Sequence, residues 1–146
     1  MIKIASFYSK TNIIYFVAAI ISLFLSTWIS YRESVINPDA ICYLLSAEEI
    51  SRGGLNAAMN LCPQAIWPFF SYLVYLFAQL TSASYLLSAN FLDAIFTLIS
   101  VITFIAIVHE LGGTRRGLCF AAMVILLSHE FNAIRQYIVR DHGFWA

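Results

Sequence analysis

Residues 11–31 read TNIIYFVAAIISLFLSTWISY, and this stretch decides the class of the protein. It carries no charged side chain, and as a helix it would be roughly 30 Å long, which is the thickness of a bilayer's hydrocarbon core. Lys3 and Lys10 precede it, so its N-terminus is expected on the cytoplasmic side. The stretch exceeds a signal-peptide core and no small-x-small cleavage site follows it, which predicts an uncleaved transmembrane helix.

The composition of the whole chain agrees with a membrane protein. Of its 146 residues, 61% are hydrophobic and 11% are charged, whereas a soluble domain averages about 25% charged residues. Eight basic and eight acidic residues leave no net charge, which argues against nucleic acid as a partner. We therefore expect an all-α integral membrane protein surrounded by membrane lipid.

A short basic loop between the last two apolar segments sets the expected topology. Arg115 and Arg116 are expected on the cytoplasmic side, where the N-terminus also lies. The two flanking segments must then cross in opposite directions, which leaves the aromatic segment at 66–80, roughly 23 Å as a helix, at the outer interface. The predicted order is a transmembrane helix at 11–31, an outer loop at 32–83 with two surface helices, transmembrane helices at 85–109 and 117–139, and the start of a second outer loop at 140–146.

The first surface helix is predicted to begin at Asn37-Pro38-Asp39. Asparagine is a favoured N-cap and proline is favoured at the first helical position. Asp39 then falls in the first turn, where the helix dipole stabilises a negative charge. Gly53-Gly54 is expected to end the helix, which is amphipathic and suited to a membrane surface.

The three cysteines form no metal-binding or redox motif. Cys42 and Cys62 flank one loop region, and they could pair if that region is exported into an oxidising space. The sequence leaves that pairing open. Cys119 falls in the last apolar segment, where it is expected to behave as a small apolar residue.

Polar side chains recur along the last apolar segment at three- or four-residue spacing. They predict a polar stripe on one face of a helix, formed by His129, Asn132, Gln136 and Arg140. His129 and Glu130 would lie at hydrocarbon depth, either as a buried pair that helps the helices pack or as the lining of a polar cavity. Asp93 allows the same two interpretations within its own helix.

Five features follow one another in a recognisable order: an apolar first helix, NPDAICY at 37–43, PQAIWPFFSY at 63–72, GGTRRG at 112–117 between two apolar segments, and an Arg-to-Asp ending at 135–141. This order resembles the N-terminal module of the membrane glycosyltransferases with the C-type fold. Relatives there include protein O-mannosyltransferases, aminoarabinose transferases and the catalytic subunit of oligosaccharyltransferase. The resemblance covers nearly the whole chain and rests on order and spacing. Because those enzymes have many more membrane helices, the chain is expected to be a shortened module.

The resemblance implies transfer of a sugar from a polyprenyl-phosphate donor to an acceptor hydroxyl, at the periplasmic face of a bacterial inner membrane. The carboxylate of the first outer loop, a general base or acceptor-orienting group, corresponds to Asp39. The acidic residue of the second outer loop, which helps to bind a divalent cation or the donor phosphate, corresponds to Asp141. The implied donor-phosphate site comprises Arg135, Arg140, Asp141 and His142, with Asp141 as the metal ligand.

Other interpretations of the same residues stay open. Asp39 also fits a helix-capping carboxylate, and the arginines with Asp141 also fit an interfacial charge belt. The chain would then be a small non-enzymatic membrane protein, such as a pseudoenzyme or a subunit that assembles with other membrane proteins. The ionisable residues inside the apolar segments would alternatively belong to a transporter fragment.

Overall fold

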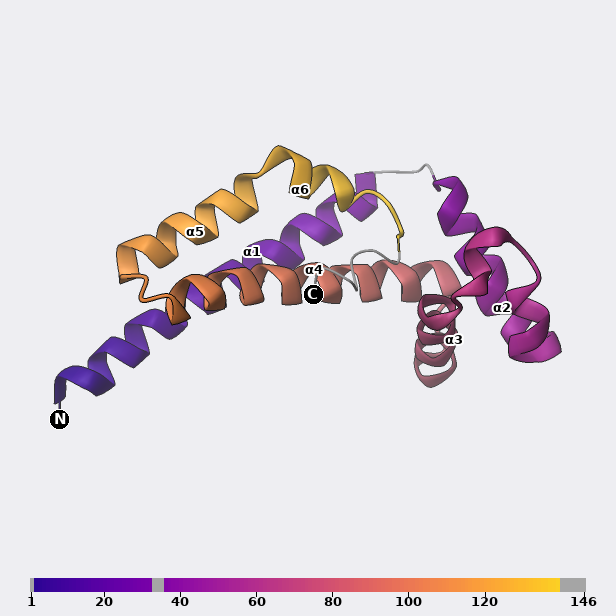
Figure 1. Ribbon diagram of the computed structural model, residues 1–146, viewed down its shortest axis with the longest axis horizontal. Coiled ribbons are helices and arrows are strands. Elements are labelled where there is room, and N and C mark those ends of the chain that lie inside the picture. The colour runs from indigo at the N-terminus through magenta and orange to yellow at the C-terminus, as the bar shows by residue number, and fades with distance from the viewer. Residues whose placement is uncertain (1, 33–35, 140–146) are drawn as a thin grey trace. The chain divides into compact units, whose positions relative to one another are not determined.

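The structure is a computed structural model that describes residues 2–32 and 36–139, with side chains described from Thr11 onward (Figure 1). The described residues form helices and turns and contain no strand. The elements are α1 (Ile2–Arg32), α2 (Pro38–Met59), the short 3₁₀ helix η1 (Pro63–Ile66), α3 (Phe69–Thr81), α4 (Tyr85–Glu110), α5 (Arg115–Leu127) and α6 (His129–Ile134). The predicted all-α class is confirmed for these residues.

Two helices are long and apolar enough to cross a membrane by length and composition. They are the stretches Thr11–Arg32 of α1 and Tyr85–Glu110 of α4, and each ends within one residue of the predicted segment. Large apolar side chains of α1 are exposed, including Phe16 at 66% and Phe24 at 62%. Such faces suit contact with lipid tails, because a bilayer core solvates apolar side chains without penalty.

The chain divides into two compact units. The first contains α1, α4 from Ala94 onward, α5 and α6, and it extends to Gln136. The second contains α2, η1, α3, α4 up to Asp93, and the described residues 137–139. Helix α4 therefore contributes residues to both units. Asp93, at the boundary, is buried and interacts within the chain.

The core of the first unit is built from residues four apart on three helices. Each pair or triplet lies on one helix face, which is the spacing that buries one side of a helix. Tyr15 of α1 and His109 of α4 have ring centroids 6.4 Å apart, so α4 ends beside the beginning of the α1 span. This antiparallel pairing is the one that the predicted topology requires. The core residues are Ile14, Ala18, Val101, Ile105, Leu118, Ala122 and Leu126.

The predicted third transmembrane helix at 117–139 is wrong as a single helix, because the chain breaks at Ser128. Helix α5 ends at Leu127, and Ser128 leaves helical geometry with ψ 118°. Its hydroxyl accepts a hydrogen bond from the Phe131 amide and so caps the six-residue α6. Helix α5 by itself is about 20 Å long, which is less than the hydrocarbon core.

The same break removes the predicted polar stripe. Helix α6 ends at Ile134, so Gln136 lies beyond it and does not share a helix face with His129. His129 and Glu130 are both exposed at the start of α6, so the predicted buried pair is wrong as well. Arg140, the last member of the stripe, lies outside the described residues. The predicted stripe required one continuous helix, and Ser128 ends that continuity because it caps a new helix.

The second unit packs α2 against α3. The Tyr43 ring meets Phe70 edge to face, with centroids 5.4 Å apart, and Phe77 of α3 stacks on Phe91 of α4 at 4.8 Å. Gly53-Gly54 was predicted to end this helix, but Gly54 forms a kink after which α2 resumes and continues to Met59, so the predicted end is wrong. The φ of Gly54 is 80°, a value that glycine adopts without strain.

Helix α3 is shorter than a membrane crossing requires. Its bounds, Phe69–Thr81, correspond to about 20 Å. Ser82 ends it in the left-handed conformation, with φ 58°. The aromatic segment predicted at 66–80 is therefore a helix of nearly the predicted extent, preceded by the 3₁₀ turn of η1.

Candidate functional site

Asp39 lies in the first turn of α2, where the sequence predicted it. Asn37 occupies the N-cap position with extended backbone, and Pro38 is the first helical residue. The Ile41 amide donates to the Asn37 carbonyl oxygen at 3.2 Å, which closes the first turn. The carboxylate therefore lies at the positive end of the helix dipole. Asp39 is half-buried, so part of the side chain stays accessible.

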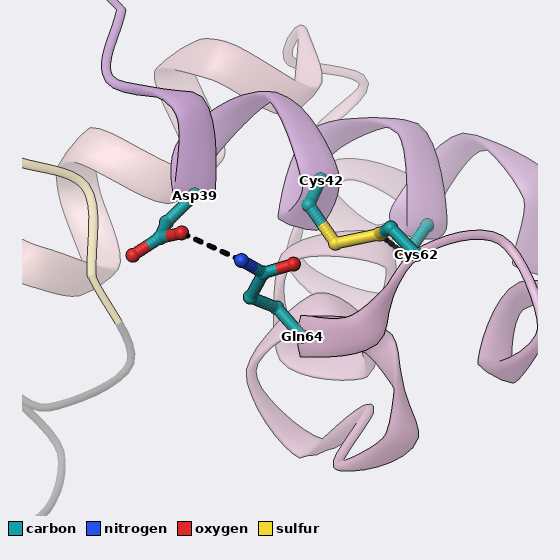
Figure 2. Close-up of a disulfide and its surroundings, with 5 residues drawn as sticks. Asp39, Cys42, Cys62 and Gln64 are labelled. Atoms are coloured by element: carbon teal, nitrogen blue, oxygen red, sulfur yellow. Dashed lines mark hydrogen bonds between the residues drawn. A yellow bond between two sulfur atoms is a disulfide. The ribbon is translucent and has the colours of Figure 1, made fainter.

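A disulfide between Cys42 and Cys62 ties this part of α2 to η1. The two Cα atoms are 6.2 Å apart, within the range that disulfides normally span. Figure 2 shows the bond beside Asp39, one helical turn further along α2. The pairing that the sequence left open is thus present, and it fixes the loop that carries η1 to the helix that carries Asp39.

Gln64 holds the carboxylate of Asp39. Its side-chain amide donates to Asp39 Oδ1 at 2.9 Å, and in Figure 2 the other carboxylate oxygen is directed away from Gln64. Ala65, the next residue of η1, is fully buried, so η1 is packed in place. One oxygen of Asp39 is thus engaged by a neutral donor, and the second is left to accept another proton or hydrogen bond.

Gln64 was not identified from the sequence, although a signal for it exists. Asp39, Cys42 and Ser46 are spaced by three and four residues and so share one face of α2. Ser46 Oγ lies 3.9 Å from Cys62 Sγ, so all three of these side chains contact η1 or the residue before it. Given the disulfide, a polar residue two positions after Cys62 is the one expected to reach Asp39.

The residue that precedes α2 contacts the segment that follows α6. Asn37 Nδ2 donates to the Ile138 carbonyl oxygen at 3.4 Å, and Ile138 is buried. The Asn37 side chain makes no capping hydrogen bond to α2, unlike the predicted cap. This contact places Ile138 close to the turn that bears Asp39. Arg140, Asp141 and His142, three of the predicted phosphate- or metal-binding residues, follow Ile138 but lie outside the described residues.

Arg135, the fourth predicted phosphate-binding residue, is buried in the first unit and bonded to α1. Its Nη1 donates to the Ser22 carbonyl oxygen at 3.0 Å and to Ser26 Oγ at 2.6 Å, and its Nη2 donates to Ser22 Oγ at 3.2 Å. Its Nε donates to Asn132 Oδ1 at 2.9 Å, and its guanidinium carbon lies 5.2 Å from the centre of the Phe131 ring. Arg135 therefore belongs to a different unit from Asp39, and these hydrogen bonds use most of the N–H donors of its guanidinium.

Metal binding finds no support among the residues described. No group of three or more His, Cys, Asp or Glu side chains gathers within 2–32 and 36–139 in a way that could hold an ion. The residue that the resemblance implies as a metal ligand, Asp141, lies beyond that part of the chain.

Comparisons with protein-family models, with curated protein sequences and with solved structures find no match to this chain. Around Asp39, an accessible carboxylate lies at the start of α2 and accepts a hydrogen bond from the neutral amide of Gln64. The Cys42–Cys62 disulfide links α2 to the residue that precedes η1.

Proposed function

We propose that the chain forms the N-terminal membrane module of a C-type glycosyltransferase. In this proposal a sugar passes from a polyprenyl-phosphate donor to an acceptor hydroxyl at the outer face of the membrane. The observation that carries the proposal is Asp39, whose carboxylate is positioned by Gln64 and by the Cys42–Cys62 disulfide with one oxygen left over. A general base needs such an arrangement, a fixed position together with an accessible lone pair.

The disulfide supports the proposed side of the membrane. Disulfides persist in oxidising compartments and are rare in the cytosol. Residues 42–62 would then face the periplasm of a bacterial inner membrane, and the basic loop at Arg115-Arg116 would face the cytoplasm. The contact between Tyr15 and His109 agrees, because it brings the start of the first span to the end of α4, just before that basic loop.

The proposed reaction uses Asp39 as the proton acceptor. The free carboxylate oxygen takes the proton of the acceptor hydroxyl while that hydroxyl oxygen attacks the anomeric carbon of the donor sugar. The bond from the anomeric carbon to the phosphate oxygen breaks, and its electron pair leaves with the polyprenyl phosphate. Gln64 keeps Oδ1 engaged throughout, which presents the second oxygen to the acceptor.

The donor phosphate is proposed to bind through the start of the second outer loop. The hydrogen bond between Asn37 and Ile138 supports this, because it holds the chain just before Arg140 and Asp141 near the turn of Asp39. Arginine suits this role because its planar guanidinium can bind two phosphate oxygens at once. Arg135 contributes less directly in this geometry, since four of its donor contacts go to Ser22, Ser26 and Asn132.

The test is a matched pair of carboxylate substitutions on α2. In protein reconstituted with a radiolabelled polyprenyl-phosphate sugar, Asp39→Asn should lower sugar transfer by about 10²–10⁴-fold, the usual contribution of a general base. Glu48→Gln is the control, because Glu48 pairs with Arg52 on an exposed part of the same helix and should leave the rate unchanged. Equal transfer by wild type and Asp39→Asn at equal abundance in the membrane would exclude Asp39 as the base.

A non-enzymatic membrane subunit is the second candidate. The observation that favours it is the exposed apolar face of α1, where Phe16, Ile20 and Phe24 are each more than half exposed. A partner helix could cover such a face. In that case Asp39→Asn would leave the phenotype of the gene intact, whereas Phe16→Ser together with Phe24→Ser would abolish recovery of the partner in detergent extracts.

A further inference from the structure

An apolar groove runs between α1 and α5 in the first unit. Its volume is about 410 Å³, and Arg115 is the one charged residue in its lining. Arg115 is the first residue of α5, so it lies at one end of the groove. The lining side chains include Ile13, Val17 and Ile21 on α1, and Arg115, Cys119 and Met123 on α5.

The charged end of the groove lies at the level where the first span begins. Helix α4 ends beside Tyr15, and a tight turn closed by the Gly113 amide on the Val108 carbonyl oxygen connects it to α5. The far end of the α5–α6 segment reaches Ser22 and Ser26 through Arg135, so α5 runs in the same direction as α1. Arg115 therefore lies near Thr11–Tyr15, the first turn of the candidate span.

We propose that this groove binds one acyl chain of an anionic phospholipid, with the lipid phosphate on Arg115. The proposal does not depend on sugar transfer. Away from Arg115 the groove lining is apolar apart from the weakly polar thiol of Cys119, and Ile13 and Met123 are about half exposed, so an acyl chain fills the space at little polar cost. At headgroup level the guanidinium can bind two phosphate oxygens, and an anionic lipid supplies the opposite charge.

The role of the Arg115 charge is tested by comparing substitutions of two neighbouring arginines. The full chain is placed in nanodiscs of equal parts phosphatidylglycerol and phosphatidylcholine, and the lipids that stay bound are counted by native mass spectrometry. Arg115→Gln should lower the retained phosphatidylglycerol by about fivefold, the effect of one arginine near an anionic surface. Arg116→Gln carries the same charge change on a residue outside the groove lining, and it should retain lipid as the wild type does.

The groove itself is tested with two neighbouring apolar residues. Met123 lines it and Val124 does not, yet their exposed fractions are nearly equal at 50% and 52%. Met123→Trp should fill the groove and displace the retained phosphatidylglycerol, whereas Val124→Trp should not. Helical content measured by circular dichroism should be the same for all four variants.

Three outcomes would overturn the proposal. Equal loss of phosphatidylglycerol in Arg115→Gln and Arg116→Gln would show a diffuse charge effect rather than a site. Unchanged retention in Met123→Trp would place the bound lipid elsewhere. A bifunctional maleimide that joins Cys119 of two chains in nanodiscs, with retention of phosphatidylglycerol lost from the cross-linked species, would show that a second copy fills the groove.

Discussion

Arg135 and Asp39 were both predicted as site residues, but they differ in exposure and in the number of hydrogen bonds that they make within the chain. Arg135, in the first unit, has its guanidinium bonded to two serines of α1 and to Asn132, and 6% of the residue is exposed. Asp39, in the second unit, is half-buried and has one hydrogen bond, from Gln64. A charged residue near an apolar segment is therefore a poor sign of function by itself. What separates the two is how many polar atoms are left to bind something else.

The largest effect should come from Arg135→Ala. The substitution leaves the hydroxyls of Ser22 and Ser26 and the side-chain oxygen of Asn132 without their buried partner. This loss should lower the free energy of unfolding by about 3–4 kcal/mol. Denaturant titration in detergent micelles measures it. Arg52→Ala is the control, because Arg52 makes an exposed ion pair with Glu48 that contributes little. Similar losses in both variants would contradict the structural role of Arg135.

Removal of the disulfide should come next. Cys42→Ser with Cys62→Ser releases a loop that the disulfide closes over a sequence separation of 20, which should cost about 3 kcal/mol of unfolding free energy. Cys119→Ser, at the exposed free cysteine, should have almost no effect. Under the proposed function, the same double variant should also slow sugar transfer, because η1 carries Gln64. A double variant as stable as Cys119→Ser would show that the disulfide does not hold η1 in the folded protein.

Gln64→Leu should affect activity more than stability. Loss of one hydrogen bond to a charged group should lower the unfolding free energy by about 1–2 kcal/mol. If Asp39 is the base of the proposed sugar transfer, the rate of transfer should fall about tenfold because Asp39 is less well positioned. Gln79→Leu, at an exposed glutamine of α3, is the control. An unchanged rate of transfer in Gln64→Leu would remove Gln64 from the proposed site.

The smallest effect is expected at Asn37. A capping asparagine normally contributes about 1 kcal/mol, but the Asn37 side chain makes no capping bond, so Asn37→Ala should cost less than about 0.5 kcal/mol. Ser128→Ala, in the first unit, removes a hydroxyl that does cap its helix and should cost about 1 kcal/mol. If Asn37→Ala proved the more harmful, the bond from Asn37 to the Ile138 carbonyl would be stronger than its 3.4 Å length indicates.

Local patterns predicted the elements well where one feature was sufficient. The two long apolar helices and the start of α2 at Asn37-Pro38 follow from apolar length and from proline at a first turn. The prediction of one helix at 117–139 was wrong because apolar composition gives no sign that the chain leaves helical geometry at Ser128. Ser128 can cap a new helix with its own hydroxyl, and hydropathy does not register that alternative.

The sequence by itself determined the all-helical class, the two stretches that can cross a membrane and the carboxylate at the start of α2. These are properties of consecutive residues, and a single pass along the chain reveals them. Only the tertiary structure decided that Gln64 holds Asp39 across a sequence separation of 25 and that Arg135 bonds to Ser22 across 113. Hydrogen-bond partners so far apart in sequence depend on how whole helices pack, and no local pattern encodes that choice.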